Sequence, residues 1–456
     1  RAHSSRPAFH HGGGEAEDKE NAARNPEKYS KECEVQIGPY RVKCQGVLGK
    51  GSFSEVWSGS VVSGPERLEV ALKDISCSNP ADMQQAVLEQ SLLERFRGLA
   101  SQGPGEAAPV MRIPRYLAHT VEKRREGTRM RLAMARVPGE PLDAFLRRPP
   151  PPKQDGPSSV RRGSLLALQL IRQLGPTLER IGAHAFHRDV NSHNILLECG
   201  DARQPHFGLV DFGLAVDISQ WEGPLGPSSW HLVDIGGDCR YWPMSAWLQF
   251  ECGWYELNKY KTLAAEYQAH LDLHALGITA LQVLSAVSSQ AQESKDLPQE
   301  VCELLKAWDA YWEEATQLSG RLLDVFRTNG DQEALKISCI NEGVHNIIGQ
   351  HLVTLRSTLR AVAKRAEVDE AMPPEALPLF AALLELVSGG GSVGFTSERA
   401  CVEEAGRKSP SKSWQAVRSL IAGTAGQRKS WWQRAPQDWP QLGLTPGYGG
   451  AGLRIY

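Results

Sequence analysis

Short β-favouring runs broken by glycines characterise the first part of the chain. Residues 40–62 (YRVKCQGVLGKGSFSEVWSGSVV) and 68–75 (LEVALKDI) have this character. Residues 84–96 (QQAVLEQSLLERF) then place their apolar side chains at helical spacing. This pattern predicts a small β-rich lobe with one amphipathic helix after its strands.

Helical periodicity dominates further along the chain. It is clearest in four stretches, at residues 164–183, 270–287, 300–326 and 346–368. The proline-rich residues 147–164 are incompatible with a helix or a central strand, so we expect a loop or insertion there. The fold class expected is α+β, with two lobes: a small β-rich one and then a large helical one.

The two ends of the sequence differ from its middle. Residues 1–38 contain few large apolar side chains and are expected to form a flexible leader. Residues 389–456 have the glycines and basic residues of a low-complexity tail. Tryptophans interleave with charge at residues 429–444, however, so a segment that docks on a partner or on its own domain is the alternative. Residues 39–388 are left as one domain.

Net charge, cysteine content and apolar stretches limit which partners and which cellular compartment we expect. A net charge of −2 gives no global field to attract nucleic acid. The nine cysteines include no CxxC pair, which argues against a zinc cage or a disulfide framework and favours an intracellular, by default cytoplasmic, location. No membrane span is expected, because the most apolar stretch, residues 377–387, is short and contains Glu385. Removal of an N-terminal targeting segment stays open.

Five short motifs follow one another in a fixed order. The glycines Gly49 and Gly51 lie in LGKGSFSEV (48–56), and Lys73 ends VALK in the next predicted strand. Glu89 lies in the predicted helix, where its carboxylate could pair with that lysine. HRDVNSHN (187–194) and DFG (211–213) complete the series. A glycine pair alone would be an ordinary hairpin turn; the ordered combination is far more specific.

This series resembles the eukaryotic protein kinase superfamily over roughly residues 40–285. The resemblance implies a two-lobed kinase-like domain, with an N-lobe at about 39–137 and a C-lobe at about 138–388 whose late helices are divergent. It also implies that ATP and magnesium are the cofactors. Residues 132–146 (LAMARVPGEPLDAFL) resemble the last N-lobe strand and the hinge, which makes Met134 the gatekeeper.

The same resemblance implies a role for each motif residue. Asp189 would accept or orient the proton of the substrate hydroxyl, and Asn194 and Asp211 would hold magnesium. The other catalytic positions are Lys73, Glu89, Arg188, which would meet a phosphate or carboxylate of the activation segment, and His193. The nucleotide contacts are Leu48, Gly49, Gly51, Ser52, Phe53, Ser54, Val56, Ala71, Lys73, Met134, Ala135 and Val137.

Two packing relationships would accompany a competent enzyme. By their motif offsets, Leu93, Phe212 and His187 should form a hydrophobic stack. Asp272, in DLHALG, resembles the helix aspartate that anchors the backbone of the catalytic loop, although it could equally cap its own helix.

The sequence departs from the family in the catalytic loop. Asn191 stands where most serine/threonine kinases carry a lysine that neutralises charge on the transferring phosphate. Losing one such donor typically costs about 10²- to 10³-fold in rate. His193 stands where tyrosine kinases often carry an arginine, and it could supply a substitute charge. An ordinary loop histidine is the alternative.

A second departure lies at residues 236–247 (GGDCRYWPMSAW), in the region of the family's substrate-contacting loop. Asp238 takes the place of a threonine, and Met244 and Ser245 replace the glutamate of Ala-Pro-Glu. The arginine segment that usually pairs with this glutamate is missing too. We therefore expect a rebuilt C-lobe, with Trp308 and Trp312 of the 300–326 helix in its core; a partner-binding face is the alternative.

The sequence thus predicts an ATP- and magnesium-dependent protein kinase, serine/threonine-specific by base rate, acting on a protein substrate. The alternative is a pseudokinase that serves as a nucleotide-binding scaffold or structural subunit. The divergent C-lobe helices and the tails are candidate surfaces for a partner protein.

Overall fold

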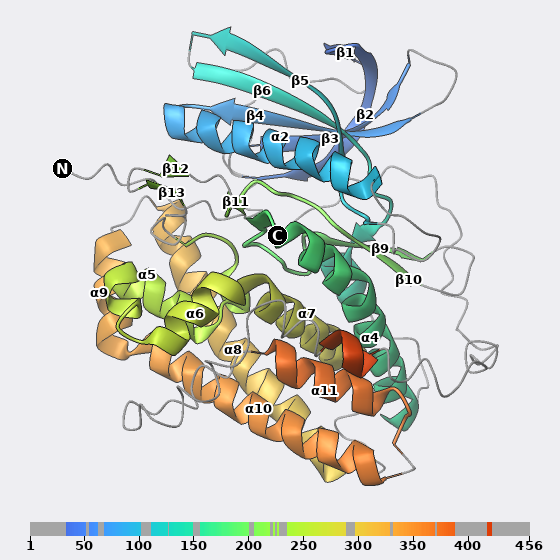
Figure 1. The fold of residues 1–456 in the computed structure, drawn as a ribbon, viewed down its shortest axis with the longest axis vertical. Coiled ribbons are helices and arrows are strands. Elements are labelled where there is room, and N and C mark those ends of the chain that lie inside the picture. Colours follow the sequence, from blue (N-terminus) through green and yellow to red (C-terminus); the bar gives the residue numbers. More distant parts are fainter. Residues whose placement is uncertain are drawn as a thin grey trace.

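The computed structural model describes residues 33–51, 54–62, 68–101, 111–125, 127–148, 156–199, 205–218, 222–223, 226–227, 235–288, 297–328, 332–369, 372–387 and 417–421. Figure 1 shows a β-sheet with one helix above a larger helical lobe. This confirms the predicted α+β class and its two lobes.

The upper lobe is a six-stranded antiparallel sheet with the order β1-β2-β3-β4-β6-β5. Its strands are β1 (Glu34–Ile37), β2 (Tyr40–Lys50), β3 (Ser54–Val61), β4 (Glu69–Cys77), β5 (Arg115–Arg124) and β6 (Gly127–Ala135). The first strand lies inside the segment predicted as a flexible leader. That prediction was wrong for β1, because Ile37 is buried in the sheet's own apolar cluster.

Strand register places the predicted nucleotide contacts on one face of this sheet. Val56 of β3 lies opposite Gly49 of β2 on one side and opposite Lys73 of β4 on the other. Ala71, two residues before Lys73 on β4, lies opposite Met134 of β6. Residues directly opposite one another, and residues two apart on a strand, point to the same face. These five residues therefore share a single surface.

The helix α2 (Pro80–Ser101) packs on β4 and β5, and it is longer than the predicted 84–96. Its start is determined by a reciprocal cap. Asp82 Oδ2 accepts from the backbone N–H groups of Ser78 and Asn79, while Asn79 Oδ1 accepts from Asp82 N at 3.0 Å. These bonds satisfy donors that the first turn would otherwise leave without partners.

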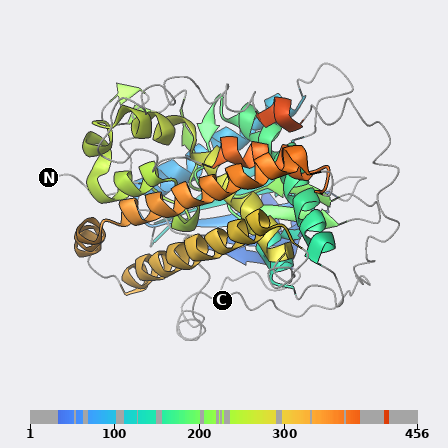
Figure 2. The same ribbon diagram turned by 90° about the horizontal axis from the view of Figure 1, so that it is seen from below.

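The helical lobe is built around α7 (Leu271–Ser288), which is buried along nearly its whole length. Figure 2 shows the other helices of this lobe from below. They are α4 (Gly156–Ile181), α5 (Met244–Leu257), α6 (Lys261–Ala269), α8 (Gln299–Arg327), α9 (Gln332–Glu342), α10 (Val344–Val368) and α11 (Ala376–Leu386). The sequence did not predict α5, α6, α9 or α11, which have only 9 to 14 residues each.

The remaining elements are small strands and one short helix. They are β7 (Glu140–Pro141), α3 (Leu142–Leu146), β8 (Ala185–Phe186), β9 (Ile195–Cys199), β10 (Pro205–Leu209), β11 (Val216–Asp217), β12 (Glu222–Gly223) and β13 (Gly226–Pro227). The helix α4 begins at Gly156, inside the stretch predicted as a loop. A proline is tolerated in the first turn of a helix, so Pro157 does not prevent this start.

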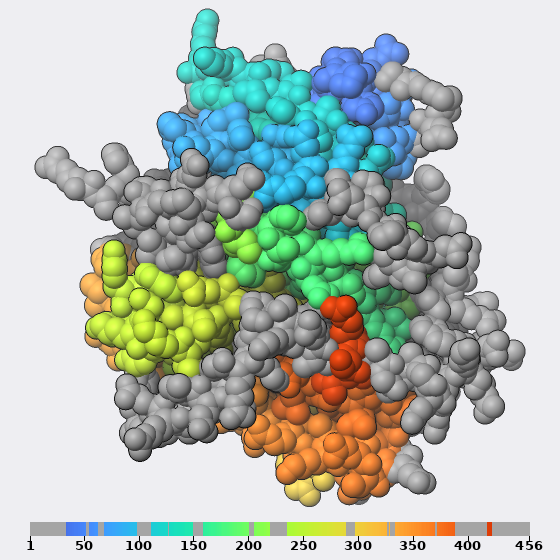
Figure 3. Space-filling view, viewed as in Figure 1, coloured from blue at the N-terminus to red at the C-terminus, as the bar shows by residue number. Residues whose placement is uncertain are grey.

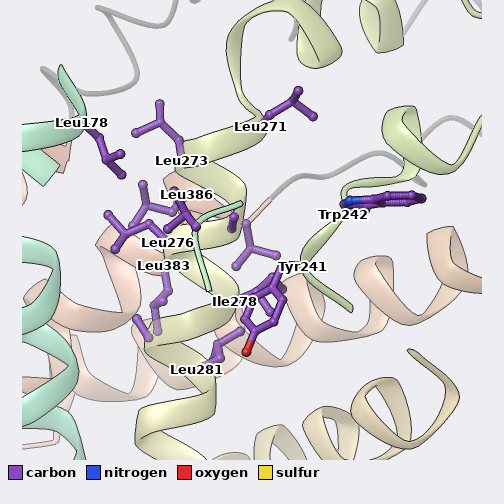
Figure 4. Close-up of a cluster of buried hydrophobic side chains, with 14 of the residues drawn as sticks. Leu178, Tyr241, Trp242, Leu271, Leu273, Leu276, Ile278, Leu281, Leu383 and Leu386 are labelled. Atoms are coloured by element: carbon purple, nitrogen blue, oxygen red, sulfur yellow. The ribbon is translucent and has the colours of Figure 1, made fainter. Parts of the chain in front are cut away.

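The expectation that residues 377–387 are the most apolar stretch overlooked α7. Its 18 residues are apolar enough to cross a membrane by length and composition, and 83% of that window is buried inside the protein. Figure 4 shows the reason: Leu273 and Leu276 of α7 lie beside Leu383 and Leu386 of α11, and Ile278 lies on the other side of the helix beside Tyr241. The apolar composition of α7 is therefore that of a core helix.

One segment of the predicted tail packs against the domain. Residues 417–421 are helical, with Val417 and Ile421 buried. Arg172 of α4 donates to Ile421 O at 3.2 Å, and Arg418 pairs with Glu179 of α4. In Figure 3 this red segment lies across the surface between α4 and α11. Residues 417–421 therefore dock on the domain, whereas the docking alternative concerned residues 429–444, which lie outside the described residues.

Candidate active site

A buried lysine bridges two carboxylates between the lobes. Lys73 Nζ of β4 donates to both carboxylate oxygens of Glu89 at 2.8 Å and to Asp211 Oδ1 at 2.7 Å. Burial by itself would lower the pKa of Lys73, but the carboxylates of Asp211 and Glu89 outweigh it and raise that pKa. The ammonium is therefore charged at neutral pH and ties α2 to the segment after β10.

Asp211 is held in an uncommon backbone conformation. Its φ is 66°, and Gly213 N donates to Asp211 Oδ1 at 3.1 Å. A Cβ on Gly213 would lie 3.0 Å from both Asp211 Oδ1 and Lys73 Nζ. Any larger residue would press on the ion pair, which explains the glycine of DFG.

The ring of Phe212 is buried between the lobes. It meets the imidazole of His187 edge-on at 4.7 Å and the ring of Phe96 at 5.4 Å. Leu93 is fully buried in the same apolar cluster. Phe212 thus lies on the inward side expected of a competent arrangement, with Phe96 as an aromatic neighbour that the sequence did not predict.

The catalytic loop brings Asp189 and Asn194 together. Asn194 Nδ2 donates to Asp189 Oδ2 at 2.6 Å and to the backbone oxygen of Asp189 at 3.0 Å. The other carboxylate oxygen, Oδ1, accepts from Asn191 Nδ2 at 2.8 Å and from Asp238 N at 3.1 Å. Asp189 is 3% exposed, so these donors hold its carboxylate in one orientation.

Asn191 organises this loop through both ends of its amide. While Nδ2 bonds to Asp189, Oδ1 accepts from the backbone N–H groups of His193 at 2.9 Å and Asn194 at 3.0 Å. The residue is buried. It therefore positions neighbouring groups by hydrogen bonding, a role that the sequence comparison with a lysine did not suggest.

Asp272 anchors the same loop from α7. Its Oδ2 accepts from His187 N at 2.7 Å and its Oδ1 from Arg188 N at 2.8 Å, which confirms the predicted anchor. Burial raises the pKa of Asp272 to about 6, and the two backbone donors act in the opposite direction. Arg188 itself has a φ of 65°. Its predicted contact with the activation segment stays a prediction.

His193 lies against Asp143 of α3. Its Nδ1 is 3.7 Å from Asp143 Oδ2, and its side chain is 53% exposed. Burial alone would raise the pKa of Asp143, but His193 and Arg147 lower it overall. The structure thus places a carboxylate next to the imidazole, and the role of His193 as a substitute charge stays a prediction.

Five of the residues predicted to contact the nucleotide, namely Gly49, Val56, Ala71, Lys73 and Met134, line the sheet face described above. Gly51 N donates to Ser54 O at 2.7 Å and closes the turn between β2 and β3. Met134 is buried, whereas Leu48 is 40% exposed. Ser52 and Phe53 lie outside the described residues. The nucleotide roles of the whole predicted set stay predictions, including those of Ala135, the last residue of β6, and of Val137 beyond it.

The oxygen ligands expected for magnesium are present. Asp211 offers a carboxylate, and Asn194 commits its Nδ2 to Asp189, which leaves its amide oxygen to ligate a cation. Within the described ranges, no three His, Cys, Asp or Glu side chains are grouped to hold a metal by themselves. This set fits a magnesium ion that completes its shell with phosphate oxygens and water.

Three contacts that the sequence did not predict tie α2 to the segment after DFG. Gln85 Nε2 donates to Gly213 O at 2.9 Å and Ala215 O at 3.1 Å. Arg95 pairs with the buried Asp217 at 2.8 Å. Gln85 and Arg95 follow no motif, so only their spatial proximity identifies them.

A buried glutamate–histidine pair joins two helices of the C-lobe. Glu251 of α5 has a fully buried side chain and accepts from His345 N at 3.0 Å and pairs with His345 Nδ1 at 2.6 Å. This pair joins α5 to the first turn of α10. The helical lobe therefore contains a buried polar joint that no motif in the sequence predicted.

Residues 42–230 match the family model described as protein tyrosine and serine/threonine kinase. The match spans the glycine loop, the lysine strand, α2, the catalytic loop and DFG. The helices from α5 onward lie beyond it.

Proposed function

The chain belongs to the protein kinase superfamily, and from this premise we propose that it transfers the γ-phosphate of ATP, with magnesium, to a serine or threonine hydroxyl of a protein. The observation that carries the proposal is the bridge from Lys73 to Glu89 and Asp211. In active kinases both the lysine–glutamate pair and the DFG aspartate must be in place. Here they are linked through one ammonium group.

The chain's own residues supply orientation and proton acceptance. Asp189, held by three side-chain and backbone donors, would accept the proton of the attacking hydroxyl. Lys73 would bind the α- and β-phosphates. Bound magnesium, held by Asp211 and Asn194, would neutralise charge on the phosphates.

The neutral Asn191 predicts a slow enzyme. Its amide is committed within the loop, so it offers the transferring phosphate no charge. We expect turnover about 10²- to 10³-fold below that of a lysine-bearing kinase. If the imidazole of His193 supplies part of the charge, His193→Ala slows transfer further, and unchanged turnover in that variant would contradict this role.

Phosphate transfer from labelled Mg·ATP tests the proposal directly. The wild-type chain and its Asp189→Asn variant are compared on a generic protein substrate and on the chain itself, followed by phosphoamino-acid analysis. Incorporation on serine or threonine that is lost in the variant supports the proposal. Phosphotyrosine alone would overturn the serine/threonine assignment.

A pseudokinase is the second candidate, and one specific observation favours it. Both carboxylate oxygens of Asp189 are engaged by donors of the chain itself. A nucleotide-binding scaffold would show a higher melting temperature with Mg·ATP but no Asp189-dependent transfer. An enzyme would show both.

A further inference from the structure

The helix α8, which lies beyond the matched kinase region, reaches the end of the activation segment. The 3₁₀ turn η2 (Cys239–Tyr241) packs against α8. Tyr311 of α8 donates from its hydroxyl to Arg240 O at 2.8 Å, and the ring of Trp312 meets Tyr241 edge-on at 5.5 Å. The turn is thereby held from the side that faces the helical lobe.

Arg240 lies between an acid and an aromatic ring. Its Nε donates to both carboxylate oxygens of Asp238 at 3.0 Å, and its guanidinium carbon lies 5.2 Å from the centre of the Trp312 ring. Trp312 in turn stacks on Trp308 at 5.1 Å, nearly parallel. Burial alone would lower the pKa of Arg240, but the Asp238 carboxylate outweighs it and raises that pKa. The side chain is therefore a fixed cation joining η2 to α8.

The residue that Arg240 holds is in direct contact with the catalytic carboxylate. Asp238 N donates to Asp189 Oδ1 at 3.1 Å. The preceding Gly237 has a φ of +91°, and a Cβ there would lie 2.5 Å from Arg188 O and 3.1 Å from Asp189 Oδ1. This close backbone approach leaves little room for Asp238 to move without displacing the carboxylate.

Tyr241 makes a second contact between the η2 turn and the catalytic loop. Its hydroxyl lies 3.0 Å from Ser192 Oγ in the catalytic loop and donates to Gln282 of α7 at 2.9 Å. Figure 4 shows Tyr241 beside α7, near Ile278 and Leu281. The turn therefore touches the catalytic loop at two points, Asp189 and Ser192.

We propose that Arg240 and Trp312 are positioning residues for Asp189: clamped between Asp238 and the α8 ring, Arg240 fixes the Asp238 N–H that orients the catalytic carboxylate. The inference rests on the proposed function, since its kinetic effect requires phosphate transfer.

Four variants test this clamp. Arg240→Met removes the charge but keeps the aliphatic stem, Arg240→Lys keeps a cation, and Trp312→Leu removes the ring. Arg321→Met is the matched control, because Arg321 is also on α8 but pairs with Glu342 of α9, away from η2. We expect Arg240→Met to lower kcat about 10²-fold, as for a misplacement of about 1 Å, with the KM for ATP unchanged. Trp312→Leu should also lower kcat, and Arg240→Lys should have a kcat between those of Arg240→Met and the wild type.

Hydrogen exchange at the Asp238 amide provides a readout that needs no catalysis. Exchange should accelerate in Arg240→Met and stay slow in Arg321→Met, while Mg·ATP raises the melting temperature of every variant that folds. Faster exchange without any wild-type transfer would mean that the clamp exists and that the proposed function fails. Unchanged exchange in Arg240→Met, a kcat within twofold of wild type, or an equal loss in Arg321→Met would each overturn the proposal.

Discussion

Asn191 Nδ2 lies 2.8 Å from Asp189 Oδ1, so the residue that stands in place of the family's lysine is hydrogen-bonded directly to the carboxylate that we propose as the proton acceptor. A lysine could donate at this position, but it could not accept the N–H groups of His193 and Asn194, as Asn191 Oδ1 does. Asparagine at this position therefore lacks the lysine's charge but holds the loop in place through its hydrogen bonds.

Replacing Asn191 should accordingly damage the loop even when charge is restored. Asn191→Ala and Asn191→Lys both remove the acceptor of two backbone N–H groups, at an expected cost of about 1–3 kcal/mol in the free energy of unfolding. Urea unfolding measures the stability, and labelled phosphate transfer measures the rate. A stable Asn191→Lys variant with faster turnover would show that the missing charge matters more than the loop.

The pair Lys73–Glu89 should be costly to break from one side. Their side chains are 5% and 3% exposed, and removing one member of a buried pair costs about 3–5 kcal/mol. Glu89→Ala should lose stability of this order together with nucleotide-dependent transfer. The double variant Lys73→Met, Glu89→Leu should lose less stability than the sum of the two single variants, as measured by urea unfolding. Additive losses would argue against direct coupling.

Gln85 should prove necessary for the position of α2. Gln85→Glu keeps the shape of the side chain but replaces the amide donor with a carboxylate, which repels Gly213 O and Ala215 O. We expect a loss of about 1–3 kcal/mol in stability and a lower kcat. Gln85→Leu, which removes the bonds without adding charge, should have a smaller effect. Equal effects of the two variants would contradict the predicted repulsion.

The joint between Glu251 and His345 should support the rebuilt lobe. Glu251→Ala removes this acceptor of His345 N and Nδ1, so we expect a loss of about 1–3 kcal/mol in the free energy of unfolding. Hydrogen exchange should accelerate first in α5 and the start of α10. Exchange that accelerates only in the upper lobe would refute the predicted location.

His274 should make the protein sensitive to acid. Burial lowers its pKa from 6.5 to about 3, so the unfolded chain binds its proton first as pH falls. The stability from neutral His274 is present above pH 6.5 and is lost towards pH 3, by up to about 1.4 kcal/mol per pH unit. Asp272, with a pKa raised to about 6, has the opposite sign: its contribution is present below 3.8 and is lost as pH rises through 6.

Comparison with a His274→Leu variant isolates the histidine contribution. The difference in unfolding free energy between the two proteins should change steadily from pH 6.5 to pH 4, with the wild type losing relative stability as pH falls. A difference independent of pH would contradict the buried neutral histidine.

The amino-acid sequence by itself determined the family, the two lobes and the order of Lys73, Glu89, Asp189 and Asp211. These conclusions depend on local spacing and on motifs of a few consecutive residues. It also led to the Asp272 anchor, because that residue lies in a recognisable local context. Predictions failed where packing outweighed the local sequence. The few apolar residues near β1 indicated a flexible leader, and the prolines near the first turn of α4 indicated a loop.

Only the tertiary structure decided how the divergent parts are joined. Tyr311 and Arg240 are 71 residues apart, and Glu251 and His345 are 94 apart, with no shared motif to relate them. The function of Asn191 likewise depends on where the N–H groups of its loop point. Such pairings are determined by the packing of helices on one another, and sequence periodicity shows which face of a helix is buried but not which residue it meets.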